Sequence, residues 1–172
     1  VALAAEFLLN GLVANGETMP RVSLKARADR TEDGRIEAHV PIQVTQNGRA
    51  SDLTLNAQLR PVDEVMHIEA RLTGQHLFVQ DLQILGAPFA AGEETAEPSE
   101  PSSGPPWSGV RGKLNMAFGT VVYSDALSAN NVEGEIAITE EALTINGLSA
   151  ALGTGGTIEM KGGLSYQENA TE

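Results

Sequence analysis

The sequence predicts an all-β protein, and three observations support this fold class. Apolar and polar residues alternate with period two in one run after another, which is typical of strands with one buried face and one wet face. Dipeptides that tolerate positive φ, such as Asp33-Gly34 and Asn47-Gly48, separate these runs and are typical of hairpins. No amphipathic helix longer than two or three turns can be drawn in the 172 residues. We therefore expect a twisted, curled and mostly antiparallel sheet that forms an open groove or an incomplete sandwich. Parallel pairing is disfavoured because crossover helices are missing.

The first half, 1–89, opens on a segment that suits either a helix or a strand, and Asn10-Gly11 in its middle favours a strand. Asn15-Gly16 is expected to form a turn after it. Four alternating runs follow. Their apolar alternates are Val22, Leu24, Ala26 and Ala28; Ile36, Ala38, Val40, Ile42 and Val44; Leu53, Leu55, Ala57 and Leu59; and Met66, Ile68, Ala70 and Leu72. Pro41 lies inside the second run and cannot donate a ladder hydrogen bond, so we expect an edge strand or a bulge there.

The segment 90–106 differs in kind, because it contains four prolines, four glutamates and no large apolar side chain. Such a composition predicts a disordered acidic linker or loop, and Trp107 is expected to pin its end to the sheet. The second half, 107–172, contains strands expected at 113–118, 120–123, 132–139, 143–145 and 157–164. Asn146-Gly147 is expected to form a turn. The segment 153–157 predicts a glycine-rich turn rather than a phosphate-binding loop, because no Gly-Lys-Ser/Thr and no helix follow.

The two halves are related in sequence. The stretch 77–82 recurs 66 residues later at 143–148, both with the pattern Leu-x-Val/Ile-x-x-Leu, and the match extends upstream without a gap. Each copy predicts an alternating strand, a turn and a second short strand. Self-similarity at a fixed offset indicates repeated units that bury their apolar faces by stacking. We expect two β repeats side by side, joined by the linker, within a piece of a longer protein.

Composition excludes several functions. A net charge of −12 and a pI near 4.6 argue against wrapping of nucleic acid, which needs clustered Lys and Arg. The absence of cysteine removes disulfides, thiolate metal sites and thiol nucleophiles. No apolar stretch approaches the roughly 18 residues needed to span a bilayer. The first residues lack a basic segment, so they do not form an intact signal peptide.

Residues with catalytic side chains show no catalytic pattern. His39, His67 and His76 share no metal-ligand spacing, and we interpret them as solvated. The acidic clusters lie in predicted turns, where carboxylates are common. They are Asp29, Glu32 and Asp33; Asp63 and Glu64; and Glu140 and Glu141. One tryptophan, two tyrosines and four phenylalanines are too few for a stacking platform. We therefore expect neither enzymatic activity nor a cofactor.

The remaining candidate is the apolar face itself. It either forms an ordinary closed core or lines an open groove that holds acyl chains, whose transfer from water contributes about 0.8 kcal/mol per CH₂ without directional partners. In the second half we expect Gly134 to leave a gap between its neighbours and the first strand to supply the opposite rim. The lipid-contacting residues of this hypothesis are Leu114, Met116, Phe118, Val132, Ile136, Ile138, Leu143 and Ile145.

The segments 107–114, 132–136, 143–150 and 156–162 contain a recurrent pattern, an idiom in which the motifs Gly-x-Leu, Val-x-Gly-x-Ile and Leu-x-Ile-x-x-Leu-x-Ala follow one another. This idiom resembles the AsmA-like family, which is similar in turn to TamB and the bridge-like lipid carriers; 53–82 carries a weaker version. The resemblance implies a periplasmic β module of a double-membraned bacterium. It also implies an N-terminal anchor in the inner membrane, which this sequence lacks, and a hydrophobic trough that helps to move phospholipid.

The expected function is therefore non-enzymatic: an envelope module that contributes to a groove for phospholipid transport or outer-membrane lipid homeostasis. Its expected partners are phospholipid acyl chains and other segments of the same longer chain. The alternative is a structural or assembly module with a sealed core and no ligand.

Overall fold

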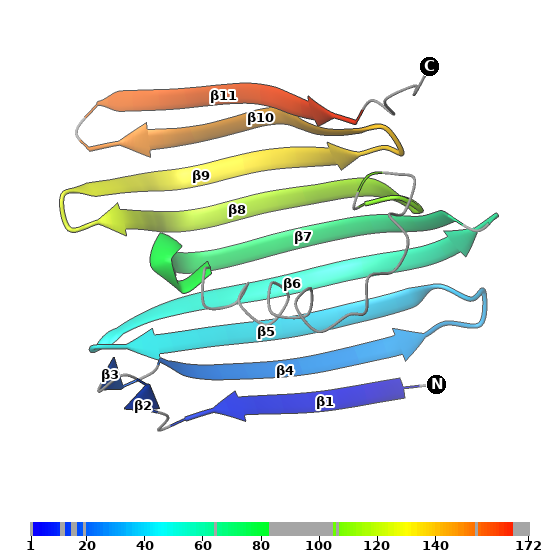
Figure 1. The fold of residues 1–172 in the computed structure, drawn as a ribbon, viewed down its shortest axis with the longest axis horizontal. Coiled ribbons are helices and arrows are strands. Elements are labelled where there is room, and N and C mark those ends of the chain that lie inside the picture. Colours follow the sequence, from blue (N-terminus) through cyan, green and yellow to red (C-terminus); the bar gives the residue numbers. More distant parts are fainter. Residues whose placement is uncertain are drawn as a thin grey trace, which may run out of the picture.

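A computed structural model describes residues 2–10, 13–14, 17–18, 20–63, 65–82, 105, 107–153 and 155–166. Nine strands lie side by side in one open sheet (Figure 1), which confirms the all-β, mostly antiparallel expectation. In spatial order they are β1 (Ala2–Leu9), β4 (Arg21–Arg30), β5 (Ile36–Gln46), β6 (Arg49–Val62), β7 (Val65–Phe78), β8 (Val110–Ser124), β9 (Leu127–Ile138), β10 (Ala142–Leu152) and β11 (Gly156–Ser165). The short strands β2 (Val13–Ala14) and β3 (Glu17–Thr18) pair separately.

One pair of neighbouring strands is parallel, contrary to expectation. β7 and β8 pair in parallel from Met66 opposite Val110 to Phe78 opposite Val122. The expectation was wrong because a crossover needs length rather than a helix, and roughly a dozen residues suffice. The connection 79–109 exceeds that length, and in its described part the only helical residues are 79–82. The parallel pair joins the two halves of the chain into one sheet.

The sheet has two chemically distinct faces. The strand alternates predicted to be apolar share one side of the sheet, here called the apolar face. Most charged and amide side chains share the other side, the polar face, but at the strand ends Arg30, Gln46 and Arg49 are in register with apolar-face residues. Apart from β2 and β3, all described strands belong to this single layer. Most apolar side chains are consequently half-buried, and the fully buried cluster is small. Its members are Leu53, Leu77, Phe118 and Val132.

A line of irregularities crosses the middle of the sheet. The backbone amides of Gln75 and His76 in β7 both donate to the Asp52 carboxylate of β6, each over 3.0 Å, so two successive residues face the same way. In β9, Asn131 has a φ of 51° beside a point where two residues oppose one of β10. Such bulges shift the alternation by one residue. Leu77 therefore returns to the apolar face and packs in the buried cluster.

Asn146-Gly147 is not a turn, as the sequence suggested, but a bulge inside β10. The register shifts between Ile145 and Gly147 against β9, and between Ile145 and Leu148 against β11. The one extra residue between Ile145 and Leu148 keeps both of these side chains on the apolar face. In β10 the apolar residues Leu143, Ile145 and Leu148 are therefore spaced i, i+2 and i+5, a spacing that indicates a strand with a bulge. Met116, Phe118 and Val121 in β8 have the same spacing.

The two copies of the sequence repeat differ in secondary structure. In the second copy, β9 and β10 form the predicted strand, turn and strand, whereas in the first copy β7 runs unbroken to Phe78 and 79–82 are helical. The prediction of a turn and a second short strand is therefore wrong for the first copy. The two expected strands at 113–118 and 120–123 are likewise one strand, β8. The division into 1–89 and 107–172 stays a prediction, and the linker 90–106 lies outside the described residues except for Pro105.

Pro41 lies in an interior strand, contrary to the prediction of an edge or a bulge. β5 pairs with β4 on one side and β6 on the other. Against β4 the pairing skips Val40 and Pro41, yet the register is unchanged between Ile42 opposite Leu24 and His39 opposite Arg27. The ladder tolerates the missing donor by a local gap, because the β6 side remains paired at Pro41.

The hairpin signals Asp33-Gly34 and Asn47-Gly48 are confirmed. Gly34 joins β4 to β5 with a φ of 84°, and Asn47-Gly48 join β5 to β6 with φ values of 51° and 77°. The opening segment is a strand over Ala2–Leu9, and Gly153 and Gly155, with φ values of 50° and 155°, lie between β10 and β11. Asn15-Gly16 lies outside the described residues.

The β4–β5 turn carries a perturbed carboxyl group. The Thr31 hydroxyl donates to Asp33 over 2.5 Å, and the Arg35 Nε donates to the second carboxylate oxygen over 2.5 Å. These bonds favour the charged form and lower the pKa of Asp33 from 3.8 to about 2. Because the folded pKa is depressed, the stabilisation is present above pH 3.8 and is lost as the pH falls toward 2.

We expect Thr31→Val to raise the pKa of Asp33 toward 3.8, because the hydroxyl is the largest cause of the shift. An NMR titration of the side-chain carboxyl carbon measures this directly. Thr45→Val, on an exposed position of β5, serves as the control and should leave the titration of Asp33 unchanged. An Asp33 pKa that stays near 2 in Thr31→Val would contradict the assignment.

Candidate functional site

The eight residues predicted to contact lipid lie together on the apolar face of β8, β9 and β10. Ile136 stands opposite Leu114 on one side and Ile145 on the other, and Phe118 stands opposite Val132. Phe118 and Val132 are buried, whereas the other six are half-buried. The three strands are hydrogen-bonded neighbours, so these side chains form one continuous surface and not two facing rims.

The expected gap at Gly134 is filled. A Cβ placed on Gly134 would lie 2.9 Å from Leu148 Cδ1 and 3.4 Å from Met116 Cε. The side chains from the two flanking strands therefore close over the glycine, and the surface stays continuous there. Met116 and Leu148 also pack against the buried cluster.

The first half adds a feature that sequence reasoning missed. Four alanines stand opposite one another across β4 to β7, so that small side chains form a row on the apolar face. They are Ala28, Ala38, Ala57 and Ala70. Larger aliphatic residues stand in register on both sides of this row. They are Ile36, Leu59 and Ile68 on one side and Val40, Leu55 and Leu72 on the other. The sequence showed each alanine as an apolar position of its own strand, but only the register between strands places the four in one row.

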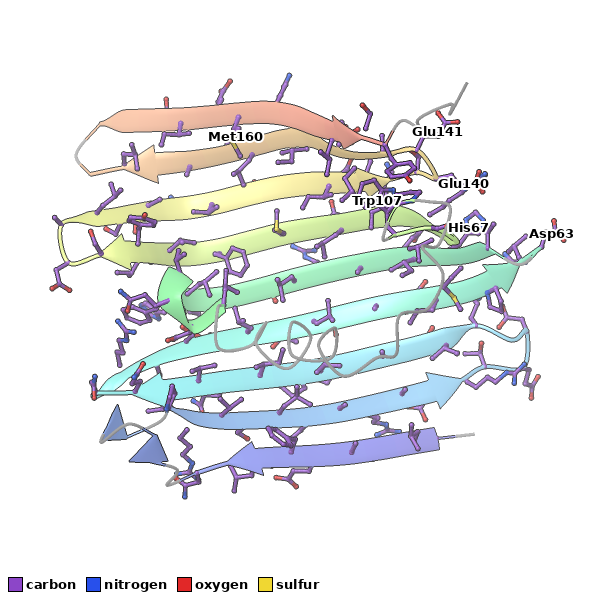
Figure 2. The ribbon with its side chains drawn as sticks, in the orientation of Figure 1. Asp63, His67, Trp107, Glu140, Glu141 and Met160 are labelled. Carbon is purple, nitrogen blue, oxygen red and sulfur yellow. The ribbon has the colours of Figure 1, made fainter. Side chains whose placement is uncertain are left out.

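The apolar face continues to both edges of the sheet. On β1, Leu3 and Phe7 pair with apolar-face residues of β4 and are 70% and 54% exposed. On β11, Ile158, Met160 and Leu164 pair with apolar-face residues of β10 and are 46%, 44% and 60% exposed. Figure 2 shows Met160 on β11, at the end of the strand order. These edge side chains are the most accessible part of the apolar face.

The polar face carries a row of polar side chains in register across six strands. They are Arg27, His39, Asn56, Arg71, Asn115 and Glu135. His39 Nδ1 lies 2.7 Å from Asn56 Oδ1, and Glu135 lies 3.7 Å from Lys113 Nζ. Hollows of about 540 and 650 Å³ open on this face, on either side of Arg71 and Asn115. Side chains of both charges line these hollows, so the face suits solvation more than recognition of one ionic group.

A buried polar cluster, also missed from the sequence, lies where β7 ends. Asp81 is 1% exposed and Ser51 is fully buried; the Ser51 hydroxyl donates to the Asp81 carboxylate over 2.6 Å. Arg49 Nη2 lies 3.6 Å from the other carboxylate oxygen and donates to Gln80 Oε1 over 2.8 Å. The Phe78 amide donates to Ser51. The cluster fixes the helical turn 79–82 on the sheet. The sequence contains one signal for this cluster: Asp81 is an acidic residue within the repeated motif, at the position that Gly147 occupies in the second copy.

The histidines and turn carboxylates do not converge on a site. His39, His67 and His76 are all exposed, as expected of solvated histidines. Asp63 and Glu140 lie in turns at one end of the sheet (Figure 2), but Asp29 lies within β4 and pairs with Arg27 over 2.8 Å. Among the described residues, no three His, Cys, Asp or Glu are placed to hold a metal ion.

Trp107 lies in the turn that leads into β8 and is half-buried. Its indole Nε1 is buried, and the Trp107 carbonyl accepts a hydrogen bond from the Val110 amide over 3.1 Å. Gly109 in the same turn accepts from the Met66 amide of β7 over 2.7 Å. The turn is thus attached to the neighbouring strand where the parallel pair begins.

The fold and its faces define a class: an open, single-layer β-sheet with one aliphatic and one polar face. Comparison of the chain with protein-family models, with curated proteins and with solved structures finds no match. In the part of the chain that the structure describes, no helix is long and apolar enough to cross a membrane.

Proposed function

We propose that this chain is a non-enzymatic, AsmA-like module of the cell envelope, and that its apolar face binds phospholipid acyl chains during lipid transport or outer-membrane lipid homeostasis. One observation carries the proposal. The aliphatic face runs in register from β1 to β11, and all described strands longer than two residues lie in the one layer that bears it. Among the described residues these strands form a single layer, and soluble monomers rarely leave a contiguous apolar surface of this extent uncovered.

The chemistry of the face suits acyl chains. Away from the polar cluster of Arg49, Ser51 and Asp81 where β6 begins, its side chains are almost all Leu, Ile, Val, Met and Ala, which carry no polar group that a hydrocarbon would leave unpaired. Each CH₂ moved from water onto such a surface contributes up to about 0.8 kcal/mol. Two acyl chains of ordinary length can therefore supply the binding free energy without directional contacts. Because the alanine side chains are shorter than the aliphatic side chains on both sides of the row, an acyl chain can lie along the row across β4 to β7.

The resemblance to the AsmA-like family supports the setting of this proposal. It favours a periplasmic location, anchoring in the inner membrane through other segments of the same longer chain, and a lipid as the cargo. The competing function is a structural module whose apolar face is sealed by neighbouring segments. Both functions need the same alternation of apolar and polar residues along the strands. The decisive test is therefore a variant whose stability and lipid content differ between an open apolar face and a closed core.

We expect Ile136→Asp to abolish co-purification of phospholipid and to leave the fold largely intact. Ile136 is half-buried and lies outside the buried cluster, so the carboxylate can reach water on an open face. On a closed core the same change would bury an unpaired charge and cost several kcal/mol. Native mass spectrometry measures bound lipid, and thermal unfolding followed by circular dichroism measures the fold.

Ala137→Asp is the matched control, because the neighbouring residue receives the same charge on the polar face. It should keep the lipid and the fold. If the parent protein carries no phospholipid and Ile136→Asp unfolds it, the lipid proposal is wrong and the sealed module takes its place.

A further inference from the structure

We infer that the sheet is continued by a second copy of the chain, with β11 of one copy pairing with β1 of the next. Among the described strands both are edges, since β11 neighbours β10 alone and β1 neighbours β4 alone. All ten residues of β11 are exposed, as are residues 2–8 of β1. Natural edge strands are usually protected by proline, by several lysines or by a bulge, since their free amides and carbonyls pair readily. β1 contains no proline or lysine, and β11 contains one lysine and no proline.

The strand directions fit such a contact. Along the sheet, every step from β1 to β11 reverses the strand direction except the parallel step from β7 to β8. Across nine strands, that single exception makes β1 and β11 run in opposite directions. A second copy displaced along the sheet therefore brings its β1 antiparallel to β11 of the first, with both apolar faces on the same side. Antiparallel pairing is also the more stable type per residue.

One register matches the side chains on both faces. With Leu164 opposite Leu3, Met160 falls opposite Phe7, and both pairs lie on the apolar face. Directly opposed apolar pairs of this kind are the unit of sheet stabilisation. The pairing would cover the edge side chains that are most exposed in the single chain.

The same register places opposite charges together on the polar face, with Lys161 opposite Glu6. Lys161 forms no ion pair with any described residue. Glu6 pairs with Lys25 over 3.4 Å, but both groups are more than half exposed, so Glu6 can reach a second cation. Gly162 then stands opposite Ala5, a small pair that lets the backbones approach. Charge complementarity and apolar matching therefore agree on a single register with a second copy.

The contact joins two different edges, so it repeats: each copy offers one β11 edge and one β1 edge. Such head-to-tail contacts generate linear or ring assemblies rather than closed dimers. This inference does not depend on lipid binding, because it concerns the edges and not the occupancy of the apolar face.

A charge exchange tests the contact in solution. Glu6→Lys alone and Lys161→Glu alone each place like charges opposite one another, and each should raise the concentration needed for assembly by about tenfold. An equimolar mixture of the two variants should assemble as the parent does, since each edge then meets the opposite charge. Sedimentation velocity over a wide concentration range measures the assembly. Glu69→Lys, an exposed acid in the interior strand β7, is the matched control and should assemble normally.

A disulfide test measures the register. The chain has no cysteine, and a Cβ at Gly162 meets no atom within 4 Å, so Gly162→Cys fits without strain. Mixing Gly162→Cys with Ala5→Cys should give an intermolecular disulfide, whereas Ile158→Cys with Ala5→Cys should not. Four residues along a strand separate the latter pair by about 13 Å, beyond disulfide reach. A parent protein that sediments as a monomer at every concentration overturns the inference. So does equal cross-linking of both pairs, or a Gly162→Cys product formed with itself alone, which indicates a symmetric β11–β11 contact.

Discussion

Replacement of Gly112 by alanine is expected to disrupt the junction between the two halves of the sheet. Gly112 lies in β8 opposite Ile68 of β7, near the start of the parallel pair. A Cβ there would lie 1.7 Å from the Ile68 carbonyl oxygen and 2.7 Å from its carbonyl carbon, and both are backbone atoms that cannot rotate away. The φ of 151° is also one that L-residues rarely adopt. Relief requires β7 and β8 to move apart.

We expect the cost to be about 3–5 kcal/mol, from backbone strain and steric overlap together. That is a large share of the roughly 5–15 kcal/mol by which a domain is stable. Urea unfolding followed by circular dichroism measures the free energy of unfolding. Gly162→Ala is the control, because its Cβ would meet no atom within 4 Å, and it should change stability by less than about 1 kcal/mol. Equal stability of the two variants would show that β7 and β8 are not paired in this register.

The second large effect is expected from Asp81→Ala. The buried carboxylate accepts from Ser51 and lies beside Arg49, whose Nε is already buried without a partner. Removing the carboxylate leaves a hydroxyl without its acceptor and a partly buried guanidinium without its counter-charge. Breaking a buried pair in this way costs about 3–5 kcal/mol. We expect the helical turn 79–82 to detach from the sheet, because Asp81 is its buried contact.

Hydrogen exchange of the Phe78 amide, which donates to Ser51, reports the local part of this effect, and urea unfolding reports the total. Asp29→Ala is the matched control, since it removes an acid that pairs with Arg27 over 2.8 Å at an exposed site. Surface pairs of this kind contribute about 0–1 kcal/mol. Similar losses for Asp81→Ala and Asp29→Ala would show that burial of the Asp81 cluster does not contribute to stability.

Local features of the fold were predictable from the sequence. Alternation identified the strands from β4 to β7 and assigned each side chain to a face, because successive side chains of a strand point in opposite directions. Asp33-Gly34 and Asn47-Gly48 predicted their hairpins because the turns require positive φ. Within each strand, the residues proposed to contact lipid share one side for the same local reason, but their union into one surface, rather than two facing rims, was not predicted.

The failures share a cause, since each concerns how one strand meets another. Asn146-Gly147 has the composition of a turn, yet its neighbours β9 and β11 continue past it, so it forms a bulge. Pro41 lacks a donor on one side only, and pairing on the β6 side keeps its strand in the interior. The Asp81 cluster depends on Arg49 and Ser51, which lie about thirty residues away in sequence and have no local signature.

The sequence by itself therefore determined the all-β class, the positions of most strands, the chemistry of each face and two of the hairpins. These depend on φ, ψ and side-chain direction, which neighbouring residues control. Only the tertiary structure decided the strand order, the parallel β7–β8 pair, the line of bulges and the alanine row. Register between strands depends on hydrogen bonds and packing between distant segments, and a one-residue slip would move every side chain to the other face. The opposite directions of β1 and β11 follow from that single parallel step, which no local pattern in the chain indicates.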